Sequence, residues 1–150
     1  MIRFEIIDGG NWRTKIETKP EQIHYVANCT TILARAYAYR EERSRAYLIF
    51  NDETPVGIVL YHDCDEMDAY IFSELLIDAK HQGKGYGRKA TEMILDEMRA
   101  DGKYKKVVLC YYEGNDVARK LYEKIGFVEV DQDEDEIIME LNFDIIKGGV

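Results

Sequence analysis

The hydrophobic pattern changes between residues 70 and 111, and this change constrains the fold more than any other feature of the sequence. Residues 70–77 are a mainly apolar run typical of a buried strand. After a glycine-rich turn, apolar residues recur every four positions from Tyr86 to Met98, as in a helix that buries one face. Residues 107–111 are a second short apolar strand. This order of strand, helix and strand predicts a right-handed crossover between parallel neighbours.

The chain before this unit predicts antiparallel strands. Residues 2–6 alternate between apolar and polar side chains, as in a half-buried strand. Residues 46–50 and 56–62 are two strands joined by a polar turn, and an acidic stretch at 63–68 leads into the strand at 70–77. Together these three strands predict an antiparallel meander.

Two further helical regions are predicted. Residues 18–21 have the form of a capping box with proline in the first turn, and predict a helical stretch to about Arg43, with a break expected near residues 28–30. Another amphipathic helix starts at Asn115 or Asp116 and ends at Gly126.

The last strands complete the expected architecture. They lie at about residues 127–130 and 136–143 and are joined by an acidic turn at 131–135. We therefore predict an α/β fold with a mixed sheet of six or seven strands, antiparallel in its first half and parallel at its centre, flanked by about four helices.

Composition limits the partners of this chain. Its 150 residues suit a single domain spanning residues 1–150, and 46% of them are hydrophobic. With 29 acidic and 20 basic residues the net charge is −9, the wrong sign for binding nucleic acid. The acidic excess suits a cationic ligand, but like charge also keeps an ordinary soluble protein apart, so both interpretations stay open.

Cysteine and histidine spacing indicates neither disulfides nor a metal. Cys29, Cys64 and Cys110 are widely separated and form no C-x-x-C pair, which fits a reducing cytosol. The three histidines are scattered, so no metal site is expected. The sequence starts without a secretory signal and lacks an apolar run of the ~20 residues that span a bilayer. We expect a cytoplasmic protein without a membrane partner.

A glycine-rich segment at residues 82–88, QGKGYGR, lies between a strand and a helix. At this position backbone amides and the positive end of a helix dipole can hold phosphate oxygens. Its spacing is neither the dinucleotide pattern G-x-G-x-x-G nor the NTPase pattern G-x-x-x-x-G-K-[ST], since Gly85 follows Lys84. The alternative is a simple connector, but Lys84, Arg88 and Lys89 in an otherwise acidic chain favour phosphate binding.

Two segments resemble the GNAT N-acetyltransferase superfamily. Residues 82–87 match its acetyl-CoA signature, Q/R-x-x-G-x-G/A, and residues 115–127 are similar to its second signature, N-x-x-A-x-x-L-Y-x-x-x-G-F. The signatures occur in the expected order, and the resemblance covers about residues 46–143. It implies the GNAT fold, whose two central parallel strands splay apart, and acetyl-CoA as cosubstrate without a metal.

The resemblance also implies a set of cofactor-binding residues. Amides of residues 83–88 would hold the pyrophosphate, and the strand backbone at residues 76–77 would pair with the pantetheine arm. An unpaired amide of the splayed strand would polarise the thioester carbonyl. Asn115 would bind the cofactor or simply cap its helix. The expected cofactor-binding residues are Leu76, Ile77, Gln82, Gly83, Lys84, Gly85, Tyr86, Gly87, Arg88 and Asn115.

Two residues are expected to move protons. Tyr122 matches the family's general acid, and a tyrosine with a pKa near 10 can donate to a leaving thiolate whose pKa is near 8.5. The alternative is aromatic packing beside Leu121. Glu74 is the candidate base, because Ser73 and Glu74 interrupt an apolar strand and some family members place a glutamate there. A solvent-facing residue at a bulge, with proton loss to bulk water, is the alternative.

The overall look of the chain is similar to bacterial spermine/spermidine N-acetyltransferases, so a small-molecule amine, first a polyamine, is the predicted acceptor. Alternatives are an aminoglycoside, an amino acid, a peptide or protein amine, or a non-catalytic acetyl-CoA sensor. The acidic clusters at 63–68 and 131–136 are interpreted as solvated turns, although the second would border the acceptor cleft in this fold.

Aromatic residues in the first 45 positions could stack on an alkylammonium or pack on the sheet; they are Trp12, Tyr25, Tyr37 and Tyr39. Dimers are common in the family. A homodimer that uses the last strand, with Ile145 and Ile146 beyond it, stays an open alternative.

Overall fold

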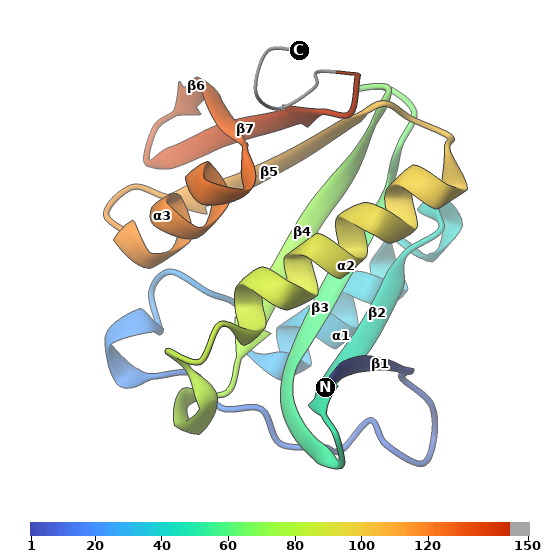
Figure 1. Ribbon diagram of the computed structural model, residues 1–150, viewed down its shortest axis with the longest axis vertical. Coiled ribbons are helices and arrows are strands. Elements are labelled where there is room, and N and C mark those ends of the chain that lie inside the picture. Colours follow the sequence, from blue (N-terminus) through green and yellow to red (C-terminus); the bar gives the residue numbers. More distant parts are fainter. Residues whose placement is uncertain (145–150) are drawn as a thin grey trace.

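The strands of this protein lie in one mixed sheet (Figure 1). The structure is a computed structural model and describes residues 1–144. Within these residues the sheet has seven strands in the order β1-β2-β3-β4-β5-β7-β6. The pair β4 and β5 is parallel and the other neighbours are antiparallel. The strands are β1 (Ile2–Ile6), β2 (Arg45–Asn51), β3 (Thr54–Cys64), β4 (Ala69–Ile77), β5 (Lys106–Tyr112), β6 (Val128–Asp133) and β7 (Glu136–Asn142).

The two central strands separate along their length. β4 and β5 pair only at Tyr70 with Val107 and at Ile71 with Val108. Directly beyond these pairs, the register of β4 against β3 shifts, because Tyr61 faces Phe72 whereas Leu60 faces Glu74. Ser73 is thus the extra residue of a β-bulge, which bends a strand and ends its pairing. The predicted mixed sheet with splayed parallel strands is confirmed.

Helices cover both faces of the sheet (Figure 1). On one face, α1 (Cys29–Ala38) buries Ile32 against Leu48 and Ile58 of β2 and β3. On the other, α2 (Tyr86–Asp101) and α3 (Asp116–Ile125) pack on the larger core cluster. Three short 3₁₀ helices complete the described part of the chain: η1 (Pro20–Gln22), η2 (Arg40–Glu42) and η3 (Ala79–His81).

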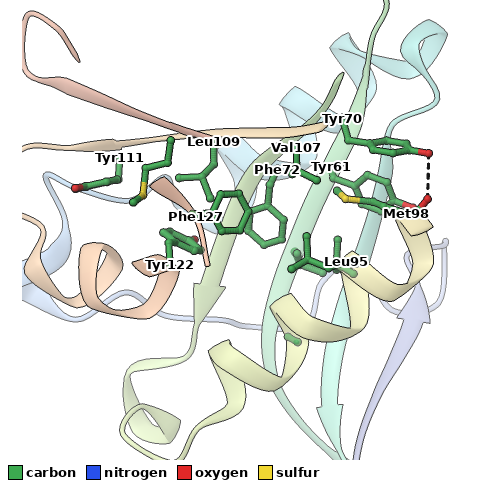
Figure 2. Packing of buried hydrophobic residues seen from close by; sticks show 14 of the residues in the cluster. Tyr61, Tyr70, Phe72, Leu95, Met98, Val107, Leu109, Tyr111, Tyr122 and Phe127 are labelled. Atoms are coloured by element: carbon green, nitrogen blue, oxygen red, sulfur yellow. Dashed lines mark hydrogen bonds between the residues drawn. The ribbon is translucent and has the colours of Figure 1, made fainter. Parts of the chain in front are cut away.

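Aromatic packing in the larger core places α3 beside the splayed strands. Figure 2 shows Tyr122 of α3 among Phe72 and Phe127. The rings of Tyr122 and Phe72 meet edge to face with centroids 6.0 Å apart, and those of Tyr122 and Phe127 do so at 5.7 Å. At the far end of the core, the Tyr70 hydroxyl donates to the carbonyl of Met98 at 3.2 Å. The Tyr122 ring is therefore anchored where β4 leaves β5.

The predicted helix from Thr18 is wrong over most of its first half. Only η1 forms there, and its N-cap, Lys19, makes no side-chain capping bond. The α-helix starts instead at Cys29, because the side-chain oxygen of Asn28 accepts from the amide of Thr31 at 2.8 Å. Residues 1–144 consequently contain three α-helices rather than about four. Ile145 and Ile146, assigned to a dimer contact, lie outside the described residues.

The first acidic cluster does not form a solvated turn throughout. β3 continues to Cys64, and Asp63 is only 3% exposed. Its carboxylate accepts from Arg43 Nε at 2.6 Å, from Arg45 Nη1 at 3.0 Å and from Lys103 Nζ at 3.1 Å. The interpretation failed here because these cations come from segments far from Asp63 in the sequence.

The second acidic turn is shorter than predicted. Asp131 and Asp133 belong to β6, where they face Ile138 and Glu136 of β7. Only Glu134, which has a φ of 55°, and the residue after it connect the two strands. In residues 1–144, no helix has both the length and the apolar character needed to cross a bilayer.

Candidate active site

A cavity of about 280 Å³ lies where β4 and β5 diverge. Its walls come from β4, the loop before α2, β5, α3 and the segment around η1. Of the residues expected from the sequence to form the site, Lys84 does not line this cavity. The others do, namely Glu74, Leu76, Ile77, Gln82, Gly83, Gly85, Tyr86, Gly87, Arg88, Asn115 and Tyr122. One cavity thus brings together residues from 74 to 122.

The glycine-rich loop forms one end of the cavity. Gly83 and Gly85 have φ angles of 79° and 83°, which residues with a side chain rarely adopt. A Cβ atom on either would meet nothing within 4 Å, so the space above them is open. Gly85 is also the N-cap of α2 and supplies no side chain to cap it. The first amides of α2 therefore remain available to an anion.

Gln82 links this loop to two other parts of the chain. Its side-chain Nε2 donates to the carbonyl of Ile77 at 3.0 Å and to Oε1 of Gln22 at 2.9 Å. The first bond holds the end of β4 and the second holds η1. In this structure the Gln82 amide is thus engaged with the protein itself.

Tyr122 of α3 reaches the cavity from the larger core. Its side chain is 8% exposed. Burial, together with the nearby Glu74 charge, raises the pKa of its hydroxyl above the usual value near 10. The phenol is therefore protonated at neutral pH and can act as a proton donor.

Glu74 reaches the cavity from the bulge in β4. Its carboxylate pairs with Arg35 of α1, and its side chain is 15% exposed. The bulge anticipated from the Ser73-Glu74 pair is present, but the interpretation of Glu74 as solvent-facing is wrong, because α1 packs over it. Burial raises the pKa of the Glu74 carboxyl, and the Arg35 charge offsets part of this effect.

Asn115 serves as the N-cap of α3, and its side-chain oxygen accepts from the amide of Ala118 at 3.3 Å. The capping alternative is therefore observed. Because Asn115 also lines the cavity, a role towards a ligand stays a prediction.

The aromatic residues proposed for the acceptor side do not gather there. Tyr25 lines the cavity, whereas Trp12, Tyr37 and Tyr39 do not. Tyr39 stacks instead on His62, with ring centroids 4.3 Å apart. Tertiary contacts position a segment that has no continuous helical pattern. The sequence alone therefore could not show that Tyr25, and not Trp12, Tyr37 or Tyr39, lines the cavity.

Several residues around the cavity were missed. Cys110 and Tyr111 of β5 line it, as does Gln22 of η1. Arg35 lies behind it and pairs with Glu74. The strand pattern places Cys110 and Tyr111 near the splay, but no local signal marks Gln22 or Arg35, whose partners lie 60 and 39 positions away.

A protonated phenol and a carboxylate thus share one cavity, with the open glycine-rich loop at its end. In the described part of the chain, no three His, Cys, Asp or Glu side chains come together as metal ligands. The arrangement suits proton transfer beside a bound phosphate ester.

Comparison with known proteins identifies the family. The model of the acetyltransferase (GNAT) family matches residues 10–127, which include the loop, Glu74 and Tyr122. The chain belongs to the GNAT family. This GNAT chain is 26% identical over 92 residues to the SPbeta prophage-derived uncharacterized N-acetyltransferase YokL of Bacillus subtilis, covering 61% of this chain and 52% of that protein.

Two further similarities involve polyamine enzymes. The spermine/spermidine N(1)-acetyltransferase of Bacillus subtilis is 30% identical over 78 residues, 48% of this chain and 51% of that protein. The matches span about half the length of these curated relatives. The crystal structure of spermidine N-acetyltransferase from Vibrio cholerae with CoA and spermine superposes with a TM-score of 0.74 at 17% identity, over 95% of this chain and 96% of that one. At this identity the superposition shows the shared GNAT fold.

Proposed function

We propose that this GNAT protein transfers the acetyl group of acetyl-CoA to a primary amine of a small cationic acceptor, with a polyamine such as spermidine or spermine as the first candidate. One observation carries the proposal: Glu74 of β4 and Tyr122 of α3 line the same cavity, which ends at the glycine-rich loop. The family match supports the reaction class.

The loop fits the diphosphate of the cosubstrate. Gly83 and Gly85 leave open space above a backbone that no side chain crowds, and the first amides of α2 add donors for phosphate oxygens. Beyond Ile71, β4 has no strand partner on the side of β5 within residues 1–144. Backbone groups on this open side of residues 76–77, apart from the Ile77 carbonyl that accepts from Gln82, would pair with the pantetheine arm as an added strand does. One such amide would polarise the thioester carbonyl.

In the proposed reaction the acceptor nitrogen loses protons and the departing thiolate gains one. An aliphatic ammonium with a pKa near 10.4 must lose a proton, which costs roughly 4–5 kcal/mol at pH 7. Glu74 would accept it, directly or through a water. The free amine would then attack the thioester carbonyl, and the C–S bond would break as Tyr122 gives its proton to the departing thiolate. As the C–S bond breaks, the nitrogen loses its second proton to solvent, Tyr122 regains a proton from solvent and Glu74 releases the one it took up. The products are the acetylated amine, the CoA thiol and one proton.

Carboxylates beside the cavity support a cationic acceptor. In the sheet register Tyr112 faces Glu136, and Glu136 faces Asp133, so these side chains share one face. The Glu136 charge adds to burial in raising the pKa of Cys110, which lines the cavity. This row would attract an ammonium ion at a rate that decreases with salt. The similarity to a spermine/spermidine N(1)-acetyltransferase and to a spermidine N-acetyltransferase also favours a polyamine.

The experiment is a screen for release of the CoA thiol from acetyl-CoA. Purified protein is offered spermidine, spermine, an aminoglycoside, amino acids and peptides in parallel. We expect the highest kcat/KM with a polyamine. Preference for another amine would overturn the acceptor, and tight CoA binding without amine-dependent release would instead indicate an acetyl-CoA sensor.

A further inference from the structure

We propose that Arg35 is a positioning residue for the reaction: it holds the Glu74 carboxylate ionised and oriented towards the cavity without itself entering the cavity. The inference rests on the proposed role of Glu74. It concerns the side of the sheet opposite to Tyr122, where the two sequence signatures supply no residue.

Glu74 and Arg35 occupy different positions relative to the cavity. Glu74 lines the cavity and Arg35 does not. A guanidinium nitrogen of Arg35 contacts Glu74 Oε1, so the two side chains form an ion pair. The Glu74 side chain is 15% exposed and that of Arg35 is 39% exposed. Arg35 thus approaches the carboxylate from the side of α1.

The helix that carries Arg35 is well anchored. Asn28 caps its first turn, and Ile32, one turn before Arg35, is completely buried between α1 and the sheet. The backbone of Ala27, directly before the cap, lies near enough to Glu74 to lower the pKa of its carboxyl. Glu74 is therefore paired with a residue in the middle of an anchored helix, which restricts the directions in which its carboxylate can point.

The charges around Glu74 leave Arg35 as the compensating group. On β3 the facing residue is Leu60, which is buried and apolar. On α3 the nearby titratable group is Tyr122, which is neutral when protonated. Burial raises the pKa of the Glu74 carboxyl, and Arg35 lowers it. Without Arg35, the carboxylate would take up a proton at a higher pH and would be a poorer proton acceptor at neutral pH.

The test is the pH profile of kcat/KM with the best amine of the screen. In the Arg35→Gln variant the acid limb due to Glu74 should move upward by about one pH unit, because an opposite charge at this distance lowers a carboxyl pKa by roughly 1–3 units. At pH values on the acid side of the profile, kcat/KM of Arg35→Gln should therefore be about tenfold lower than that of the wild type. At higher pH the two should become equal. Arg35→Lys, which keeps the charge, should return the limb towards that of the wild type.

Matched variants separate positioning from loss of structure. Arg40→Gln removes another arginine of the same segment, whose guanidinium contacts the exposed Tyr37, and should leave the profile unchanged. Affinity for CoA and the melting temperature should be similar in all variants. Arg35→Met, which keeps the aliphatic stem, is the second neutral variant if Arg35→Gln folds poorly.

The Glu74→Gln variant shows whether a negative result concerns the role of Arg35 alone or also the assignment of Glu74 as the base. If it removes the acid limb while Arg35→Gln and Arg35→Met match the wild type, the role of Arg35 is overturned and the proposed function stands. If Glu74→Gln keeps the wild-type profile, the base assignment and the role of Arg35 are both overturned. Whether acetyl transfer occurs at all is read independently, from CoA release by the wild type.

Discussion

The side chain of Gln82 joins the glycine-rich loop to the segment around η1, since it donates to Gln22 Oε1 at 2.9 Å. A second bond from the same Nε2 reaches the carbonyl of Ile77 at 3.0 Å. A further contact lies on the other lip of the cavity, where a Cβ atom on Gly114 would lie 3.2 Å from the hydroxyl of Tyr25. The segment around residues 22–25 therefore touches the loops that precede both α2 and α3.

Replacing Gln22 by Ala should weaken acceptor binding. A neutral hydrogen bond contributes about 1 kcal/mol, so we expect KM for the amine to increase about fivefold. Gln22→Glu keeps an oxygen that accepts from Gln82 and should remain close to the wild type. Steady-state kinetics with each variant measure this difference, and equal KM values for the Ala variant and the wild type would show that the bond does not order the acceptor side.

Replacing Tyr122 by Phe should reduce catalysis and leave the fold intact. General acid catalysis contributes about 10²–10⁴-fold, so kcat should decrease at least about a hundredfold. The ring contacts with Phe72 and Phe127 survive the change, and the melting temperature should therefore change little. Thiol release gives kcat and calorimetry gives the affinity for CoA. Unchanged turnover would remove Tyr122 from the role of acid.

Two glycines of the loop should respond oppositely to Ala. Gly85 has a φ of 83°, so Gly85→Ala should cost about 1–2 kcal/mol of stability and up to about tenfold in CoA affinity. Gly87 lies in α2, and a Cβ there would meet carbon atoms of Ile77 and Leu75 at an ordinary 3.6 Å. Gly87→Ala should thus raise the free energy of unfolding by about 0.5 kcal/mol. Thermal unfolding and CoA titration compare them, and equal destabilisation by both would contradict the strain argument.

Asp63 should make stability dependent on acid pH. Burial alone would raise the pKa of its carboxyl, but hydrogen bonds from Arg43, Arg45 and Lys103 outweigh this and lower it below the usual value near 3.9. The stabilisation is therefore complete above about pH 4 and is lost as the pH falls towards the folded-state pKa.

The corresponding variant is Asp63→Asn. It should lower the free energy of unfolding at pH 7 by about 3 kcal/mol, because it removes the buried carboxylate that three cations share and leaves them only their pairs with Asp101 or Asp65. Asp96→Asn, which affects an exposed pair with Arg99, should change it by less than about 1 kcal/mol. Denaturant titrations between pH 3 and pH 7 provide the measurement. If the wild type and Asp63→Asn lose the same free energy of unfolding between pH 7 and pH 3, the Asp63 carboxylate does not cause the acid dependence.

Local features of the sequence were sufficient for most elements. The strand at residues 70–77, the helix after the glycine loop and the helix capped by Asn115 appear where short-range patterns predicted them. The same patterns failed at Thr18, where a capping sequence forms only one turn of 3₁₀ helix. In that segment Gln22 and Tyr25 contact the loops before α2 and α3. Such tertiary contacts can override a local preference for helix.

The sequence by itself determined the glycine turn and the order of strands and most helices, because these depend on residue types at short spacings. Tyr122 and Glu74 became candidates through the resemblance of those spacings to the GNAT signatures and strand. Only the tertiary structure decided what surrounds them: Arg35 behind Glu74, Gln22 against Gln82, and three cations on Asp63. These partners lie 18 to 60 positions apart. Their pairing follows from sheet register and helix packing, which no short stretch of residues encodes.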